Sequence, residues 1–272
     1  MIDIPIGNGK IVTNHEGYCM LTDFYHKCCE QKLGSDILID FENLEWLDGN
    51  MAALVVAMLM KMELERGFIF HVDRDDIRSR FGILVKNGLI SGVEIVEREN
   101  MAALELTGFE INEDQRFIQY IKSQLLSHQS QNFDDDQKKK LMRALLELYS
   151  NVQKHARSKD PYFVCGQYFK NSKLLRFTLV DIGVGYLKPI QEFTNGKVDS
   201  SNKAIQWALK KGNTTSPDSP GGLGLQDILD YCKESGAVFD IITGNAYWST
   251  SHKPKKVREF CGTTVNLTFK CQ

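Results

Sequence analysis

The sequence lacks a long run of apolar residues. The longest run, Met51–Met60, has ten residues before Lys61 interrupts it, whereas a membrane-spanning helix needs about 20. We therefore expect a buried helix here and no contact with a membrane. The first residues, Met1–Pro5, also lack the basic start and apolar stretch that mark an export signal.

A basic excess is missing as well. Lys and Arg number 33 against 35 Asp and Glu, which gives a net charge of −2 and a pI near 6.3. Proteins that bind phosphate backbones or anionic lipid usually carry a positive excess, so we expect no nucleic-acid partner. Apolar residues are 42% and charged residues 25% of the 272, which is typical of a globular chain with two domains.

The cysteines form no recognisable framework. There are seven, an odd number, without a Cys-x-x-Cys pair, so neither a disulfide ladder nor a zinc site is indicated. His26, Cys28 and Cys29 are close in sequence, but adjacent residues on a helix diverge by about 100° and are poorly placed to share a metal ion. These features favour a reducing compartment, and we expect a cytoplasmic protein.

The first part of the chain reads as one βαβα unit, which implies parallel strands joined by a right-handed crossover. We expect Asn50 to cap the first helix and Gly67 to end it. A domain boundary is predicted near Gly108. The expected elements are strand Asp36–Asp40, helix Met51–Arg66, strand Phe68–Val72, helix Asp75–Lys86 and strand Ala102–Thr107.

The second part reads as helices on one face of a mixed or antiparallel sheet. The stretch Tyr186–Pro220 is rich in Gly, Ser and Thr, and we expect a mobile loop with one helix, Lys203–Lys210. The other expected elements are helices Glu113–Ser127, Asp134–Ala156 and Leu225–Glu234, and strands Tyr162–Phe169, Leu174–Asp181, Ala237–Thr243 and Thr263–Lys270, with a short Tyr247–Trp248 stretch.

Glu147, Asn151 and Lys154 share a polar face of the helix Asp134–Ala156. A carboxylate, a carboxamide and an ammonium on successive turns can activate a water or hydroxyl, ligate Mg²⁺ and hold a phosphate. The alternative, which this segment alone favours, is a solvated helix face.

Two glycine motifs follow. In Asp181-x-Gly183-x-Gly185, after a strand, the carboxylate could accept from an exocyclic amine such as adenine N6, and the glycines leave room for a flat ring. In Gly221-Gly222-Leu223-Gly224-Leu225, at the start of a helix, backbone N–H groups could surround phosphates. The alternatives are an ordinary strand-to-turn connection and a flexible hinge.

The order and spacing of these motifs, ending with Gly262-Thr263-Thr264, resemble those of the GHKL ATPase family, which includes gyrase and the histidine kinases. The likeness covers about 133–270, and the Asn-x-x-Lys-His-Ala form of its first motif is most similar to the histidine-kinase and anti-sigma-factor branch. It implies a Bergerat-type α/β sandwich with ATP between the sheet and a lid at Tyr186–Pro220.

By this resemblance each motif residue has a role. Asn151 would ligate Mg²⁺, and Glu147 occupies the place of the general base. Asp181 would bind the adenine amine, and Gly183 and Gly185 would frame the base. The phosphates would meet Lys154, with His155 beside it, and the Gly221–Gly224 backbone ahead of Leu225. Thr263 or Thr264 would support the adenine pocket.

One part of a histidine kinase is missing. The histidine ahead of the ATP motifs, His128, is followed by Gln129 and Ser130 rather than by an acidic residue, and it lies in a polar break between predicted helices. We therefore expect that the protein does not phosphorylate itself on histidine.

The N-terminal unit is similar, more loosely, to the STAS fold of anti-sigma-factor antagonists over Ile37–Leu89. That family has a phosphorylated serine where this chain has Asp48-Gly49-Asn50-Met51, so no acceptor hydroxyl remains. The likeness implies a sensing or docking module that is not switched by phosphorylation at this point.

The sequence thus predicts a STAS-like domain, residues 1–108, and a GHKL ATP-binding domain, residues 109–272. We expect a Mg²⁺-dependent, ATP-binding signalling protein that acts as an ATP-hydrolysing switch or as a serine/threonine kinase of a partner protein. The alternative is a non-catalytic, anti-sigma-factor-like regulator that sequesters its partner. Apolar residues of 113–127 would either pair with a second copy in a homodimer or pack on the body. The basic stretch 252–258 would be a solvated hairpin tip or a landing site for an acidic partner.

Overall fold

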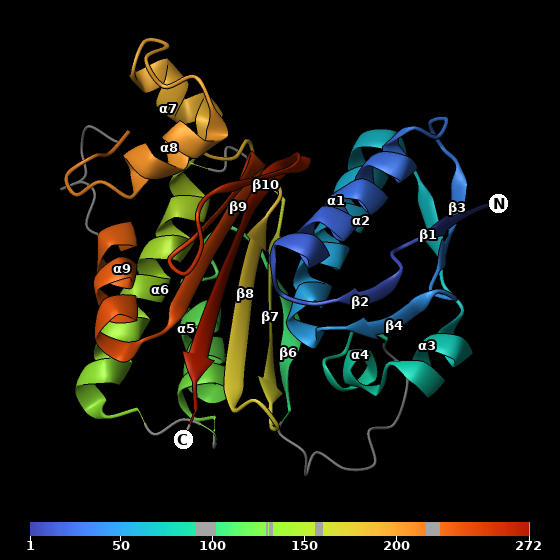
Figure 1. Cartoon of the computed structure of the whole chain (residues 1–272), viewed down its shortest axis with the longest axis horizontal. Helices are drawn as coiled ribbons and strands as arrows, with labels where there is room; N and C mark the ends of the chain where they lie inside the picture. Colours follow the sequence, from blue (N-terminus) through green and yellow to red (C-terminus); the bar gives the residue numbers. More distant parts are fainter. Residues whose placement is uncertain (91–101, 129, 131–132, 156–159, 216–223, 272) are drawn as a thin grey trace.

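The computed structural model describes residues 1–90, 102–128, 130, 133–155, 160–215 and 224–271. Within them the chain is a mixed α/β protein with two parallel sheets, of three and two strands, and an antiparallel sheet of five (Figure 1). The mixed α/β class predicted from the sequence is confirmed at this level. We call residues 1–90 the N-terminal part and residues 102–271 the C-terminal part.

In the N-terminal part, parallel strands run in the order β1-β3-β5. The predicted parallel pairing of β3 with β5 is confirmed. Before β3 the structure contains two strands and a helix that were not predicted. The elements are β1 Ile2–Pro5, β2 Gly9–Ile11, α1 His15–Cys29, β3 Asp36–Asp40, β4 Leu44–Leu47, the 3₁₀ turn η1 Gly49–Met51, α2 Ala52–Arg66, β5 Ile69–His71, α3 Arg74–Arg80 and α4 Gly82–Lys86.

Two local predictions in this part are wrong. Asn50 does not cap α2: it lies inside η1, fully buried, and its Nδ2 donates to Thr178 Oγ1 at 2.9 Å. The helix predicted over 75–86 is broken at Phe81, whose backbone leaves the helical region (φ −122°, ψ 59°) while its ring is buried. Gly67 ends α2 as expected, with φ 65°.

In the C-terminal part, five strands run in the order β6-β7-β8-β10-β9, and every neighbouring pair is antiparallel. The predicted boundary near Gly108 falls inside β6, where Gly108 is in register with Phe163 of β7. The elements are β6 Ala103–Phe109, α5 Asp114–Tyr120, the π-helix η2 Ile121–Leu126, α6 Asp135–His155, β7 Tyr162–Phe169, β8 Leu174–Asp181, α7 Leu187–Phe193, α8 Ser201–Ala208, α9 Gly224–Ser235, β9 Val238–Ser249 and β10 Lys255–Lys270.

The end of the chain is more regular than predicted. The stretch expected to hold one helix between 186 and 220 contains two, α7 and α8, and residues 216–220 lie outside the described part. The separate Tyr247–Trp248 stretch belongs to β9, which forms a long hairpin with β10. The basic residues His252 and Lys253 are exposed at its tip.

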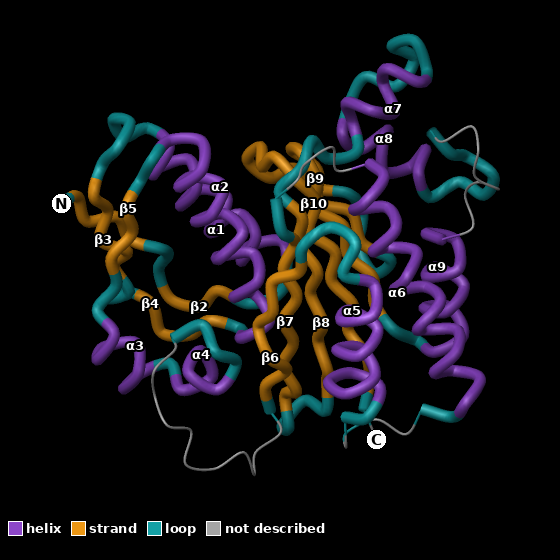
Figure 2. Tube along the Cα trace, turned by 180° about the vertical axis from the view of Figure 1, so that it is seen from behind, coloured by secondary structure: helices purple, strands orange, loops and turns teal. Residues whose placement is uncertain are grey.

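Helices of the C-terminal part lie on one face of the antiparallel sheet, as predicted, whereas the covering of its other face by the N-terminal part was not predicted. Figures 1 and 2 show α5, α6 and α9 on one face and α1 and α2 on the other. Phe177 and Leu179 of β8 pack with the first set of helices, whereas Val180 of β8 belongs to a core shared with the N-terminal part, as does Ile182 directly after the strand. An apolar sheet face must be buried, and here the N-terminal part buries it. Apolar residues of 113–127, such as Phe117, are likewise buried within the chain.

A buried carboxylate also ties the two parts together. Asp48, 1% exposed, accepts hydrogen bonds from the backbone N (2.7 Å) and Oγ1 (2.8 Å) of Thr13 and from Trp46 Nε1 (2.8 Å). It also forms an ion pair with Arg176 of β8. Because a buried charge requires such partners, this cluster fixes how the N-terminal part sits on the sheet. The Asp48–Met51 stretch is therefore an internal contact.

Candidate functional site

A buried carboxylate ends the central strand of the sheet. Asp181 is the last residue of β8 and is 6% exposed. It lies on the sheet face covered by α5, α6 and α9, because side chains alternate along a strand and Leu179 points to that face. Its Oδ1 accepts a hydrogen bond from Gly183 N at 2.9 Å, which folds the following turn back onto the carboxylate.

The protonation of this carboxyl is unusual. Burial raises the pKa of Asp181 to about 6, although hydrogen bonds from Gly183 and Thr263 and the charge of Lys61 act in the opposite direction. A carboxylate has room for about four hydrogen bonds, so Asp181 can accept another donor without losing those it has. Desolvation of this kind is typical of functional sites as well as of structural ion pairs.

The backbone around Asp181 packs too closely for larger residues. Gly185 has φ 67°, and a Cβ there would lie 2.6 Å from Thr243 Oγ1. Gly262 has φ 127°, and a Cβ there would lie 2.2 Å from the Asp181 carbonyl oxygen. Thr243 links the two glycine turns: its Oγ1 donates to Gly262 O at 2.9 Å and accepts from Tyr186 N at 3.2 Å. These contacts hold the turn in one shape.

The two candidate threonines of β10 lie on opposite faces of the sheet. Thr263 is in register with Asp181, and Thr264 is in register with Val180. Thr263 therefore shares the face of Asp181, while Thr264 points toward the N-terminal part, where it is fully buried. Only Thr263 is placed to act with the carboxylate.

The helix α6 brings a carboxylate and a carboxamide to the same side of the sheet. Glu147 and Asn151 are half-buried and stand one turn apart on α6. Within the described part of the chain, no side chain forms an ion pair or hydrogen bond with the Glu147 carboxylate. Lys154 and His155 lie in the last turn of α6, and their side chains lie outside the described part.

The second glycine motif is described only at its end. Gly221, Gly222 and Leu223 lie outside the described residues. Gly224 is the first residue of α9, and Leu225 is buried in the core. The motif therefore leads into the N-terminus of a 12-residue helix, the end of a helix that favours an anion.

Helices α7 and α8 stand beyond the end of the sheet at which β8 finishes. Both views place them next to the C-terminal end of α6 and the beginning of α9 (Figures 1 and 2). Ser201, the first residue of α8, accepts from Asn245 N of β9 at 3.4 Å, so this segment is anchored to the sheet. The described ends of α6 and β8 and the described start of α9 therefore lie toward the same end of the molecule.

Sequence reasoning missed Lys61 and Thr243. Lys61, on α2, is 7% exposed and donates to Ile182 O at 3.2 Å, inside the turn that follows Asp181. The sequence does mark Lys61, because it is the first charged residue after the apolar run of α2. Thr243 ends a predicted strand, but only the register with Thr263 reveals that it faces the same turn.

A scan against protein-family models returned no match, and a search of curated proteins returned no similar sequence. Among the described helices, none is long and apolar enough to cross a membrane. What the site does must therefore be inferred from its own residues.

Proposed function

We propose that this chain binds ATP with Mg²⁺ in a Bergerat-type site of the GHKL kind and acts in signalling as an ATP-hydrolysing switch or protein kinase, with the N-terminal part as a STAS-like module. The observation that carries the proposal is Asp181: a buried carboxylate with acceptor capacity to spare, at a strand end framed by two close-packed glycine turns. An adenine amine is a donor that suits it.

The residues present fit a nucleotide. Gly185 lets Thr243 Oγ1 and the Gly262 carbonyl oxygen approach the backbone closely, which fixes the shape of the turn beside the Asp181 carboxylate. The start of α9 offers N–H groups to an anion. In sites of this type Mg²⁺ takes one or two protein oxygens and completes its shell with phosphate and water, so the Asn151 carboxamide is a sufficient protein ligand. The bound ion would neutralise phosphate charge.

Glu147 is the proposed general base. Its carboxylate is half-buried, has no ion-pair partner in the described part of the chain and stands one turn before Asn151. A general base in this position would accept a proton from the attacking water or hydroxyl, while Asn151 would hold the metal and Asp181 would hold the adenine. Positioning and charge neutralisation provide most of the catalysis in phosphoryl transfer.

His128 is unsuited to accept a phosphoryl group. It is 4% exposed, its Nδ1 is 2.6 Å from Ser130 Oγ, and its ring lies 5.5 Å from that of Tyr168. The His128 ring is therefore buried and in contact with other side chains, although it lies in a polar break between helices. Tyr168 pairs with Leu175, six residues before Asp181, which is roughly 20 Å along β8. This placement supports the proposal that the protein does not phosphorylate itself on histidine.

Two variants test the proposed roles. Glu147→Ala should bind ATP nearly normally and lose phosphate release by about 10²–10⁴-fold, whereas Asn151→Ala should also lose the Mg²⁺-dependent part of binding. Phosphate release and equilibrium binding, each with and without Mg²⁺, measure both. Normal binding without phosphate release in the unmodified protein, and without label transfer to lysate proteins, would favour the non-catalytic regulator. Equal loss of binding in both variants would contradict separate roles.

A further inference from the structure

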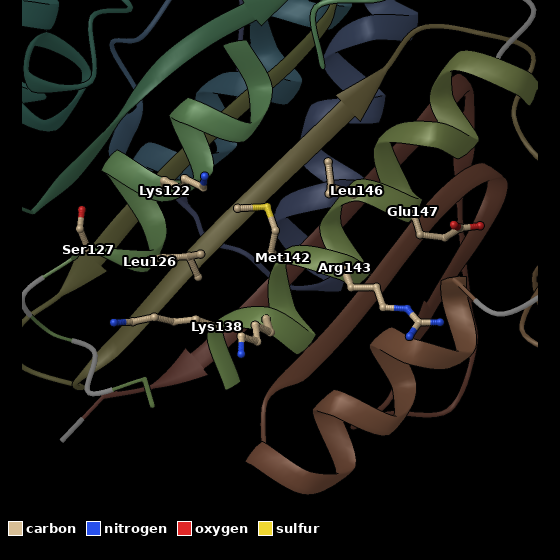
Figure 3. A pocket seen from close by; sticks show the side chains of 9 residues that line it. Lys122, Leu126, Ser127, Lys138, Met142, Arg143, Leu146 and Glu147 are labelled. Carbon is tan, nitrogen blue, oxygen red and sulfur yellow. The ribbon is translucent and has the colours of Figure 1, made fainter. Parts of the chain in front are cut away.

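A groove of about 700 Å³ runs between η2 and α6, on the outer side of the helix layer. Leu126, Met142 and Leu146 provide its apolar surface. Figure 3 shows Met142 pointing across toward the side of Leu126 and Lys122, while Arg143 and Glu147 project from the other side of α6. The groove therefore has an apolar floor between two helical walls.

The walls of this groove are positively charged. Lys122 stands on η2, and Lys138 and Lys139 stand on the first turns of α6. In the part of the chain that the structure describes, no carboxylate forms an ion pair with any of the three, although the neighbouring Lys140 pairs with both Asp136 and Glu234. The chain as a whole carries −2, so this positive cluster is a local feature.

We propose that the groove docks an amphipathic helix from a partner protein, with apolar side chains on one face and acidic residues beside them. The floor offers places for apolar side chains at helical spacing, and the three lysines complement flanking carboxylates. From Lys138 to Glu147 the wall rises about 14 Å, which matches between two and three turns of a helix.

The surface suits a helix better than other anions. None of the nine lining residues is aromatic, whereas single-stranded nucleic acids are bound largely by stacking on aromatic rings. The apolar residues lie on the floor, where an extended lipid surface would not reach them easily, but a narrow helix would. Lys122 and Lys139 are exposed, so they can reach the sides of an occupant.

Docking is separable from nucleotide binding. Of the lining residues, only Glu147 belongs to the proposed ATP site, and it projects away from Lys122. Arg143, which is also a lining residue, is held by Asp227 of α9 at 2.9 Å. The docking proposal therefore does not depend on ATP binding, and it can be tested with variants that leave Glu147 and Asp181 intact.

The test is a selection of displayed random peptides of about 16 residues, long enough to cover the groove as a helix, on the full-length chain. The best binder is then synthesised, labelled and titrated by fluorescence anisotropy. We expect enrichment of Asp and Glu with apolar residues three and four positions apart. Lys122→Glu with Lys139→Glu should weaken the binder at least about tenfold, and Met142→Gln should weaken it as well.

The matched control is Lys253→Glu with Lys255→Glu, the same charge change at the exposed β9–β10 hairpin, which should leave binding unchanged. Circular dichroism confirms that each variant is folded. Selected peptides that bind the groove variants and the unmodified chain equally, or a selection without acidic enrichment, would overturn the proposal. Binding of anionic vesicles or of a single-stranded oligonucleotide through Lys122 and Lys139, when acidic peptides do not bind, would also overturn the proposal.

Discussion

The Nζ of Lys61 donates to the carbonyl oxygen of Ile182 at 3.2 Å, so a helix of the N-terminal part holds the turn that follows Asp181. Lys61 also pairs with Glu65 at 2.7 Å, and its charge opposes the rise in the pKa of Asp181. The candidate site is therefore assembled from both parts of the chain. A change in how they pack would reach the proposed nucleotide site through this contact.

We expect Lys61→Met to lower the free energy of unfolding by about 1–2 kcal/mol, because a buried carbonyl loses its donor while the apolar stem is replaced. Urea denaturation measures the change. Glu65→Gln is the matched control: it removes the ion pair on the exposed side and leaves the Ile182 contact intact. An equal loss of stability in both variants would show that the carbonyl contact contributes nothing.

Asp181→Asn should stabilise the unliganded protein more at neutral pH than at acid pH. The folded pKa of Asp181, about 6, is above its ordinary value of 3.8. The contribution of Asp181 to the stability of the natural protein is therefore fully present below about pH 4 and is lost as the pH rises through about 6. Relative to the natural protein, the variant should gain about 1–3 kcal/mol between pH 4 and pH 7.5.

Chemical denaturation of the two proteins across this pH range tests that prediction. Asp3→Asn, at an exposed position of β1, is the control and should show little change with pH. A stability difference between Asp181→Asn and the natural protein that is the same at both ends of the range would contradict the burial of an ionised carboxylate.

Asp48→Ala should destabilise the chain by about 3–5 kcal/mol, because it leaves Arg176 without its partner in a largely buried place. Thr13 and Trp46 also lose their acceptor. Denaturation with Asp36→Ala as the control, at an exposed carboxylate of the same part, measures the effect. A loss of less than about 1 kcal/mol in the free energy of unfolding is what a surface ion pair contributes. Such a result would show that the Asp48 cluster does not fix how the N-terminal part sits on the sheet.

A fragment that begins at Ala102 should aggregate or bind hydrophobic dyes. Without the N-terminal part, the second face of the sheet exposes Phe163, Val180 and Ile242, and each such side chain contributes about 1.5–3 kcal/mol when buried. Light scattering and dye fluorescence, compared with the full chain, report the outcome. A monodisperse fragment that unfolds cooperatively would mean that the C-terminal part is an independent domain.

The local sequence pattern was enough to predict several helices and strands, but it did not predict how they pack against one another. The bounds of β3, β7 and β8 agree with those predicted, because each is a β-rich run between turn residues. The break at Phe81, the burial of Asn50 and the covering of the second sheet face depend on contacts with residues distant in sequence. The same is true of Lys61, whose partner Ile182 lies 121 positions away.

The candidate site was predictable in its residue types and less so in its geometry. An ordinary strand-to-turn connection was the alternative interpretation of Asp181-x-Gly183-x-Gly185, and the structure shows a turn that is closed by the Asp181–Gly183 hydrogen bond. The sequence left Thr263 and Thr264 as alternatives, which only the strand register separates.

The central claim, that Asp181 binds adenine, is tested most directly by calorimetric titration of the full chain and of Asp181→Asn with ATP and with GTP in Mg²⁺. We predict that the natural protein prefers ATP and that the variant, which replaces an acceptor oxygen with a donor, loses about tenfold to a hundredfold in ATP affinity while it stays folded. An unchanged ATP affinity in Asp181→Asn, or no binding of ATP by the natural protein, would contradict the account.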